Sequence, residues 1–144
     1  MSFVHAVRSQ FIVALSALCV AAFALSVSAR ADELADFHAA VEQAAAQYRI
    51  AMTTLETRGQ DETAAAIHRF REAWQAIIDR FGKNPPAPFA DDEQYGAMFV
   101  LVDTRLIGVL LVIDMGNREA ARDALAPIQE TLSRLSARSA PTER

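Results

Sequence analysis

The sequence predicts an all-α protein: an antiparallel up-down-up-down four-helix bundle that follows a cleaved N-terminal signal peptide. Four segments carry apolar residues at alternating steps of three and four, which is the spacing of one helix face. Two of the three connections between them are short, so consecutive helices are expected to turn back on each other. A three-helix arrangement with a docked or swapped fourth helix is the alternative.

Residues 1–31 have the features of an export signal. His5 and Arg8 give a positive start, an apolar run follows over 11–23, and Ala29-Arg30-Ala31 offers a small-residue cleavage site. The apolar run is shorter than the roughly 20 residues that a spanning helix needs, which disfavours an uncleaved anchor. We therefore predict a periplasmic or secreted protein. The predicted divisions of the chain are signal peptide 1–31, bundle 32–138 and flexible tail 139–144.

Charge and cysteine content argue against several classes of function. The chain has 14 basic and 18 acidic residues; removal of Arg8 and Arg30 with the signal leaves 12 basic residues and a net charge of −6. Nucleic-acid binding needs a basic surface, so we expect none. The single cysteine, Cys19, lies in the signal, and Leu18 before it is not the small residue that lipid attachment requires. The mature chain then has no thiol for a disulfide, a metal site or a nucleophile.

The first two helices are predicted over 32–57 and 61–81, on either side of Gly59. Asp32 and Asp61 are their expected N-caps. Each helix has one apolar stripe. The first stripe consists of Leu34, Phe37, Val41, Ala44 or Ala45, Tyr48, Met52 and Leu55. The second stripe consists of Ile67, Phe70, Trp74, Ile77 and Phe81.

A proline-rich linker over 83–90 precedes the last two helices, and Phe89 within it is expected to pack against the end of the bundle. The third helix is predicted to open with a capping box of Asp91 and Gln94 and to run to Met115. The fourth is predicted over 118–137, with Pro127 bending it. Its stripe consists of Ala121, Leu125, Ile128, Leu132 and Leu135.

The stretch 97–113, AMFVLVDTRLIGVLLVI, is the longest apolar run outside the N-terminus. Asp103 and Arg105 near its middle would cost about as much at a bilayer centre as its large apolar residues gain, about 5 kcal/mol on each side. We therefore predict a bundle helix rather than a membrane span. Its core stripe is expected to consist of Phe99, Val102, Leu106, Val109 and Ile113.

This third helix has more apolar residues than one core stripe uses. Large exposed apolar surface marks an interaction site. We predict that Ile107, Leu110 and Leu111 point outward and contact a second copy or another periplasmic protein. Contact with a membrane is expected only if the signal is uncleaved. The predicted role is non-enzymatic, because the sequence has no glycine-framed nucleophile and no phosphate-binding glycine loop.

Three groups of residues resemble one known family. They are the linker Lys83-Asn84-Pro85-Pro86, the aromatic pair Tyr95 and Phe99, and the turn Gly116-Asn117. With the export signal, they resemble the periplasmic four-helix cytochromes, namely the soluble b-type cytochrome and cytochrome c′, over about 32–137. The resemblance implies the bundle fold.

The haem ligands of that family do not carry over to this chain. The b-type relatives use a methionine early in the first helix and a histidine late in the fourth. Here those regions hold Phe37, next to His38, and Leu135-Ser136-Ala137. The c′ relatives need a C-x-x-C-H motif, which this sequence lacks. We therefore expect no cofactor.

His38 and Met98 are the candidate ligands of a metal site. Both lie near the end of the bundle where the first and third helices begin, together with acids that also suit helix N-termini. Imidazole and thioether groups suit copper or haem iron. A cytochrome-like electron carrier or metal binder with these atypical ligands is the alternative function. His68 is expected to lie at the core boundary, and Met52, Met98 and Met115 to fill the core.

Overall fold

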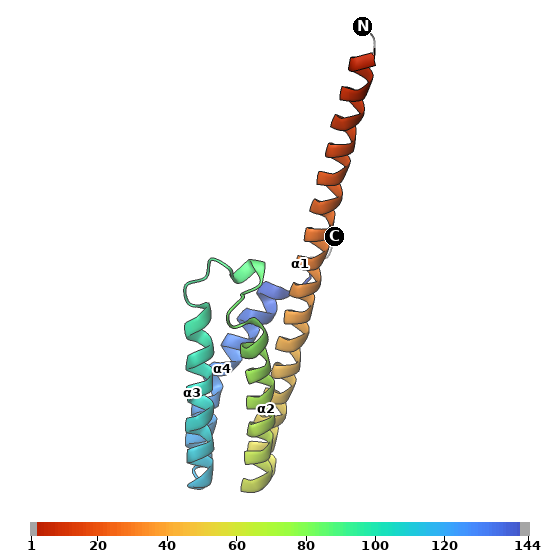
Figure 1. Ribbon diagram of the computed structural model, residues 1–144. Helices are drawn as coiled ribbons and strands as arrows, with labels where there is room; N and C mark the ends of the chain where they lie inside the picture. The colour runs from red at the N-terminus through yellow and green to blue at the C-terminus, as the bar shows by residue number, and fades with distance from the viewer. Residues whose placement is uncertain (1–2, 142–144) are drawn as a thin grey trace. The chain divides into compact units, whose positions relative to one another are not determined.

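The computed structural model describes residues 3–141 of the chain, and side chains from residue 29 onward. Four α-helices, α1 (Phe3–Thr57), α2 (Gln60–Phe81), α3 (Tyr95–Asp114) and α4 (Arg118–Ser139), and a 3₁₀ turn, η1 (Ala87–Phe89), make up its secondary structure (Figure 1). Residues 3–141 contain no strand. The all-α prediction is confirmed.

The chain divides into two compact units, one up to Glu33 and one from Leu34 onward. In the first unit the described residues belong to α1 alone. The predicted signal peptide, 1–31, lies within this unit and remains a prediction. The predicted tail begins at Ser139, but Ser139 is the last residue of α4 and is buried. The end of that tail, 142–144, lies outside the described residues.

The second unit holds one apolar core to which all four helices contribute. Every predicted stripe residue of α2, α3 and α4 is buried, which confirms the helical spacing. In α1 the stripe is also buried, apart from Leu34, Ala45 and Met52, which are half-buried. The largest fully buried side chains are Trp74, Phe37, Phe70, Phe89, Leu55, Ile67, Ile77, Leu106, Leu125, Ile128, Leu135 and Val41.

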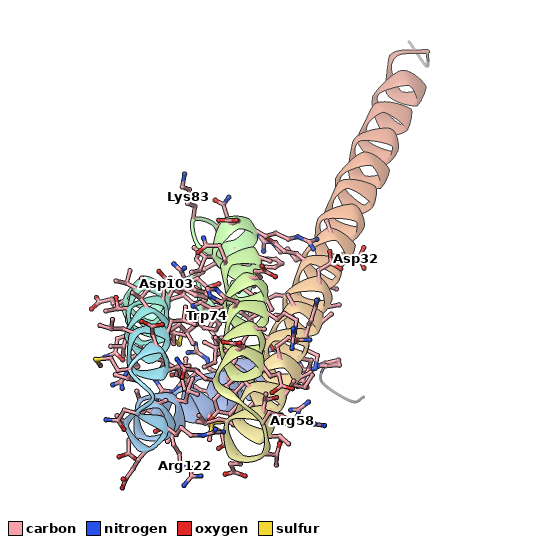
Figure 2. All side chains as sticks on the ribbon, turned by 90° about the horizontal axis from the view of Figure 1, so that it is seen from below. Asp32, Arg58, Trp74, Lys83, Asp103 and Arg122 are labelled. Atoms are coloured by element: carbon pink, nitrogen blue, oxygen red, sulfur yellow. The ribbon has the colours of Figure 1, made fainter. Side chains whose placement is uncertain are left out.

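Aromatic contacts join the helices of this unit. Phe37 of α1 meets Phe81 of α2 edge to face, with 5.1 Å between ring centroids. Trp74 lies on the side of α2 that faces α3 (Figure 2), where its ring centroid is 5.2 Å from that of Phe99. Phe89 is buried against Phe37 at 5.2 Å, as predicted for the linker. Offset and edge-to-face pairs of this kind stabilise a core beyond the area that they bury.

Two helix starts differ from prediction. The helix that contains Asp32 extends upstream to Phe3, so Asp32 does not cap it. The N-cap of α2 is Gly59 rather than Asp61. The Gly59 N–H donates to Oε2 of Glu62 at 2.9 Å, so the side chain of the third helical residue reaches back to the N-cap backbone, and no aspartate caps the helix.

The start of α3 is also later than predicted. Residues 91–94 form a turn, in which Asp92 Oδ1 accepts from the backbone N–H of Gln94 at 3.0 Å, and Gln94 is the N-cap. The Asp91–Gln94 capping box is therefore wrong. The turn into α4 follows the prediction: Gly116 has a φ of 76°, which favours glycine, and Asn117 Oδ1 caps α4 by accepting from Ala120 N–H at 3.0 Å.

Candidate functional site

The exposed face of α3 is the main apolar surface that the structure shows. Six large apolar side chains are exposed among the residues whose side chains are described, and five of them lie on α3 or at its C-cap. The sixth, Ile50, lies on α1. We call these five the α3 stripe; its members, with their exposed fractions, are Val100 (68%), Leu101 (53%), Ile107 (51%), Leu111 (61%) and Met115 (65%).

The sequence places these residues on one face. Their successive steps are one, six, four and four, so they share the side of the helix opposite to the buried stripe. Ala97, Thr104 and Gly108 lie on the same face and are exposed. A Cβ added at Gly108 would meet nothing within 4 Å. The midline of the stripe is therefore lined by small residues over which another surface can approach closely.

The three interaction residues predicted from the sequence do not all point the same way. Ile107 and Leu111 are exposed, whereas Leu110 is half-buried and packs against the core. Leu110 therefore lies at the edge of the surface. Met115, expected in the core, is exposed. Its spacing of four from Leu111 puts it on the same face of the helix, and that spacing could have identified it.

Opposite charges flank the stripe. On the α2 side, Asp103 Oδ1 accepts from Nε of Arg71 at 2.9 Å; Figure 2 labels Asp103 on α3. Arg105 lies seven residues after Met98, so the two share the other edge of the helix, where Met98 faces α4 residues. Arg105 is half-buried and makes no ion pair with any residue of the described part of the chain. One edge of the stripe thus carries a carboxylate that is paired through Oδ1 with Arg71, and the other edge carries an arginine without an ion pair among the described residues.

By length and composition alone, α3 resembles a membrane span. Its mean hydropathy is 2.1 over a window in which 28% of residues are buried. Among the described residues it is the one helix that meets these criteria. The helix also supplies six buried residues to the core of the second unit, so one side of it is already covered by protein.

The two candidate metal ligands occupy different surroundings. His38 is half-buried, and its Nδ1 lies 2.9 Å from Oγ of Ser139 on α4. Met98 lines a hollow of about 380 Å³ between α3 and α4 that His38 does not line. Within the part of the chain that the structure describes, no three His, Cys, Asp or Glu side chains gather as a group that could hold a metal ion. His68, expected at the core boundary, is exposed.

Salt-bridged side chains line the rim of that hollow. Nη1 of Arg138 donates to Oδ2 of Asp92 at 2.5 Å, and its guanidinium lies over the Phe89 ring at 4.4 Å. The bond from Arg138, helped by the backbone N–H of Gln94, lowers the pKa of Asp92. These contacts fix the linker to the end of α4.

A second, more open groove of about 630 Å³ lies between α1 and α4, and no sequence pattern predicted it. Its floor includes Tyr48 and Met52, and Arg49 stands at its edge. The Tyr48 hydroxyl donates to the carbonyl oxygen of Leu125 at 3.4 Å, and burial raises its pKa. Small residues of both helices, among them Ala45 and Ser133, are part of its lining.

Comparisons of the chain with models of protein families, with curated proteins and with solved structures find no match.

Proposed function

We propose that this protein is an exported, non-enzymatic helical bundle that works by docking another protein surface on the α3 stripe. The observation that carries the proposal is the concentration of exposed large apolar side chains on one face of one helix. Apolar surface of this kind, bordered by polar residues, is typical of interaction sites. The proposed docking residues are Ile107 and Leu111 at the centre, with Leu110 at the edge.

The proposed topology is the antiparallel up-down-up-down bundle. Two contacts support it. Phe37, early in the second unit, meets Phe81 at the end of α2, whereas Tyr48, eleven residues later in α1, meets Phe70, eleven residues earlier in α2. Contacts that advance along one helix while they retreat along the other are those of antiparallel neighbours. The proposed resemblance to the four-helix cytochromes concerns this topology alone. We propose no haem ligands for the chain.

Export to the periplasm is proposed from residues 1–31. The apolar run 11–23 and the small residues before Asp32 support cleavage by a signal peptidase. The N-terminal sequence of the protein recovered from the periplasmic fraction tests this. A chain that begins near Asp32 is the expected result, and an intact N-terminus in the membrane fraction would contradict it.

Photo-cross-linking in living cells tests the docking surface. A photoreactive amino acid replaces Leu111, Ile107 or, as the control, Ile50, an exposed apolar residue on α1. We expect protein adducts from positions 107 and 111 and none from position 50. Equal adducts from all three positions would indicate nonspecific apolar contact, and adducts with lipid alone would indicate a membrane-facing helix.

A further inference from the structure

We propose that the partner that docks on the α3 stripe is a second copy of this chain, packed with its α3 parallel to the first. This inference rests on the proposed function, because it uses the same surface. A two-fold axis that runs along the two helices would bring the two stripes together. The small residues Ala97, Thr104 and Gly108 would lie along the line of closest approach.

The charges beside the stripe favour a second copy as the partner and a parallel arrangement of the two α3 helices. On a helix with about 3.6 residues per turn, Asp103 and Arg105 lie about 100° to either side of the midline of the stripe. A two-fold axis along the helices places the Asp103 edge of each copy, where Arg71 occupies only Oδ1 of the carboxylate, against the Arg105 edge of the other. Asp103 then faces Arg105 twice. Unlike Asp103, which Arg71 already holds, Arg105 has no ion pair within the described residues.

The reach of the side chains is compatible with this pairing. Asp103 and Arg105 differ by two residues, or about 3 Å, along the helix axis. Helical side chains lean toward the N-terminus, so the longer Arg105 leans toward the level of Asp103. In antiparallel packing like edges would meet instead, and Arg105 would face Arg105. Like charges brought together in this way disfavour association.

The size of the stripe predicts a weak dimer. From Ala97 to Met115 it extends about 28 Å and is about 10 Å wide, or about 300 Å² per copy. Two stripes bury about 600 Å² together, whereas stable interfaces bury about 1,200–2,000 Å². We therefore expect a dissociation constant between about 10 μM and 1 mM, with association that depends on concentration.

Sedimentation equilibrium measures the association. The protein is expressed from the full sequence, including its N-terminal segment, and is purified in the form that the cells produce. We expect monomer at about 1 μM and about half of the chain or more in dimers near 1 mM. Leu111→Glu and Arg105→Glu should each weaken the dimer at least about tenfold, whereas Ile50→Glu should leave it unchanged. Circular dichroism and Trp74 fluorescence verify that the variants fold. A chain that stays monomeric at about 1 mM would overturn the proposal.

Single-cysteine variants in a Cys19→Ser background test the direction. In a parallel pair, equal positions lie opposite each other along the whole stripe, so Ala97→Cys, Thr104→Cys and Met115→Cys should all form disulfide-linked dimers under mild oxidation. In an antiparallel pair only the position nearest the two-fold axis would do so. Linkage at one of the three positions alone therefore overturns the parallel arrangement.

The cross-linking at position 111 described above separates this inference from the proposed function. An adduct with twice the mass of the chain supports the second copy. An adduct with a different protein overturns the second copy and leaves the docking function standing. The absence of any protein adduct overturns both.

Discussion

Arg71 on α2 donates from Nε to Oδ1 of Asp103 on α3 at 2.9 Å, at the border between the core and the α3 stripe. Both side chains are about a third exposed, at 37% and 27%. The pair ties α2 to α3 and holds the Asp103 edge of the stripe in place. Asp103 therefore has a partner within its own chain, whereas Arg105, two residues later, has none within the described residues.

The coupling between Arg71 and Asp103 is expected to be modest. Partly exposed ion pairs are screened by solvent, so a double-mutant cycle with Arg71→Ala and Asp103→Ala should give a coupling free energy of about 0.5–1 kcal/mol. Urea denaturation followed by fluorescence of the single tryptophan, Trp74, measures it. A coupling free energy near zero would show that the pair does not hold in solution.

Replacement of Phe37 should destabilise the bundle strongly. Its ring is fully buried between Phe81 and Phe89, so Phe37→Ala removes aromatic contacts and leaves a cavity. We expect the free energy of unfolding to fall by about 3–5 kcal/mol. Ala39→Ser, at an exposed position of the same helix, is the control and should change it by less than about 0.5 kcal/mol. Equal effects of the two substitutions would contradict the burial of Phe37.

The core could be predicted from the sequence because helical periodicity reports directly which side of a helix is apolar. The stripes of α2 and α4 were found for this reason. The ends of the helices were harder to predict. Several polar residues near each end can act as caps. The N-caps are Gly59 and Gln94 rather than Asp61 and Asp91, because the helix start depends on the conformation of the preceding turn.

The candidate site could be predicted in part. The surplus of apolar residues in α3 indicated an outward face, and Ile107 and Leu111 lie on it. Leu110 was misplaced, because assignment of a boundary residue needs the rotation of the helix to within about one residue. Met115 was assigned to the core although its spacing of four from Leu111 puts it on the exposed face. The α1–α4 groove is lined by residues of two distant segments, and no pattern within one helix reveals it.

Arg118 should stabilise the end of α1. Its guanidinium donates to the carbonyl oxygen of Leu55 and, at 2.6 Å, to that of Arg58, which are among the acceptors that a helix C-terminus leaves free. Arg118→Ala should lower the free energy of unfolding by about 1–2 kcal/mol. Arg122→Ala is the control, because Arg122 only meets exposed Glu56 at 3.6 Å, and its effect should stay below about 0.5 kcal/mol. The reverse order of effects in urea denaturation would contradict this assignment.

The Asp92–Arg138 contact predicts a specific pH dependence. The hydrogen bond from Arg138 lowers the pKa of Asp92 in the folded state, so its contribution to stability is fully present above the unfolded pKa of about 3.9. It is lost as the pH falls from that value through the lower folded pKa. The difference in free energy of unfolding between the wild type and Asp92→Asn should therefore shrink below about pH 4. Denaturation curves between about pH 2 and 7 measure it; a difference that stays constant over this range would contradict the lowered pKa.

Substitution by lysine should destabilise the fold strongly at Leu106 and hardly at all at Leu111. Leu106 is 0% exposed and Leu111 is 61% exposed, although both belong to α3. Leu106→Lys would bury an unpaired ammonium group, so we expect it to unfold the protein or to lower the free energy of unfolding by more than about 4 kcal/mol. Leu111→Lys should change that free energy by less than about 0.5 kcal/mol when it is measured near 1 μM, where the chain is expected to be monomeric.

The same pair of variants separates folding from docking. Leu111→Lys should abolish dimerisation near 1 mM while the Trp74 fluorescence and the denaturation curve stay as in the wild type. If Leu111→Lys instead destabilises the monomer as much as Leu106→Lys does, then the face that holds Leu111 is covered by this chain itself. The α3 stripe would then be part of the core, and it would offer no surface to a partner.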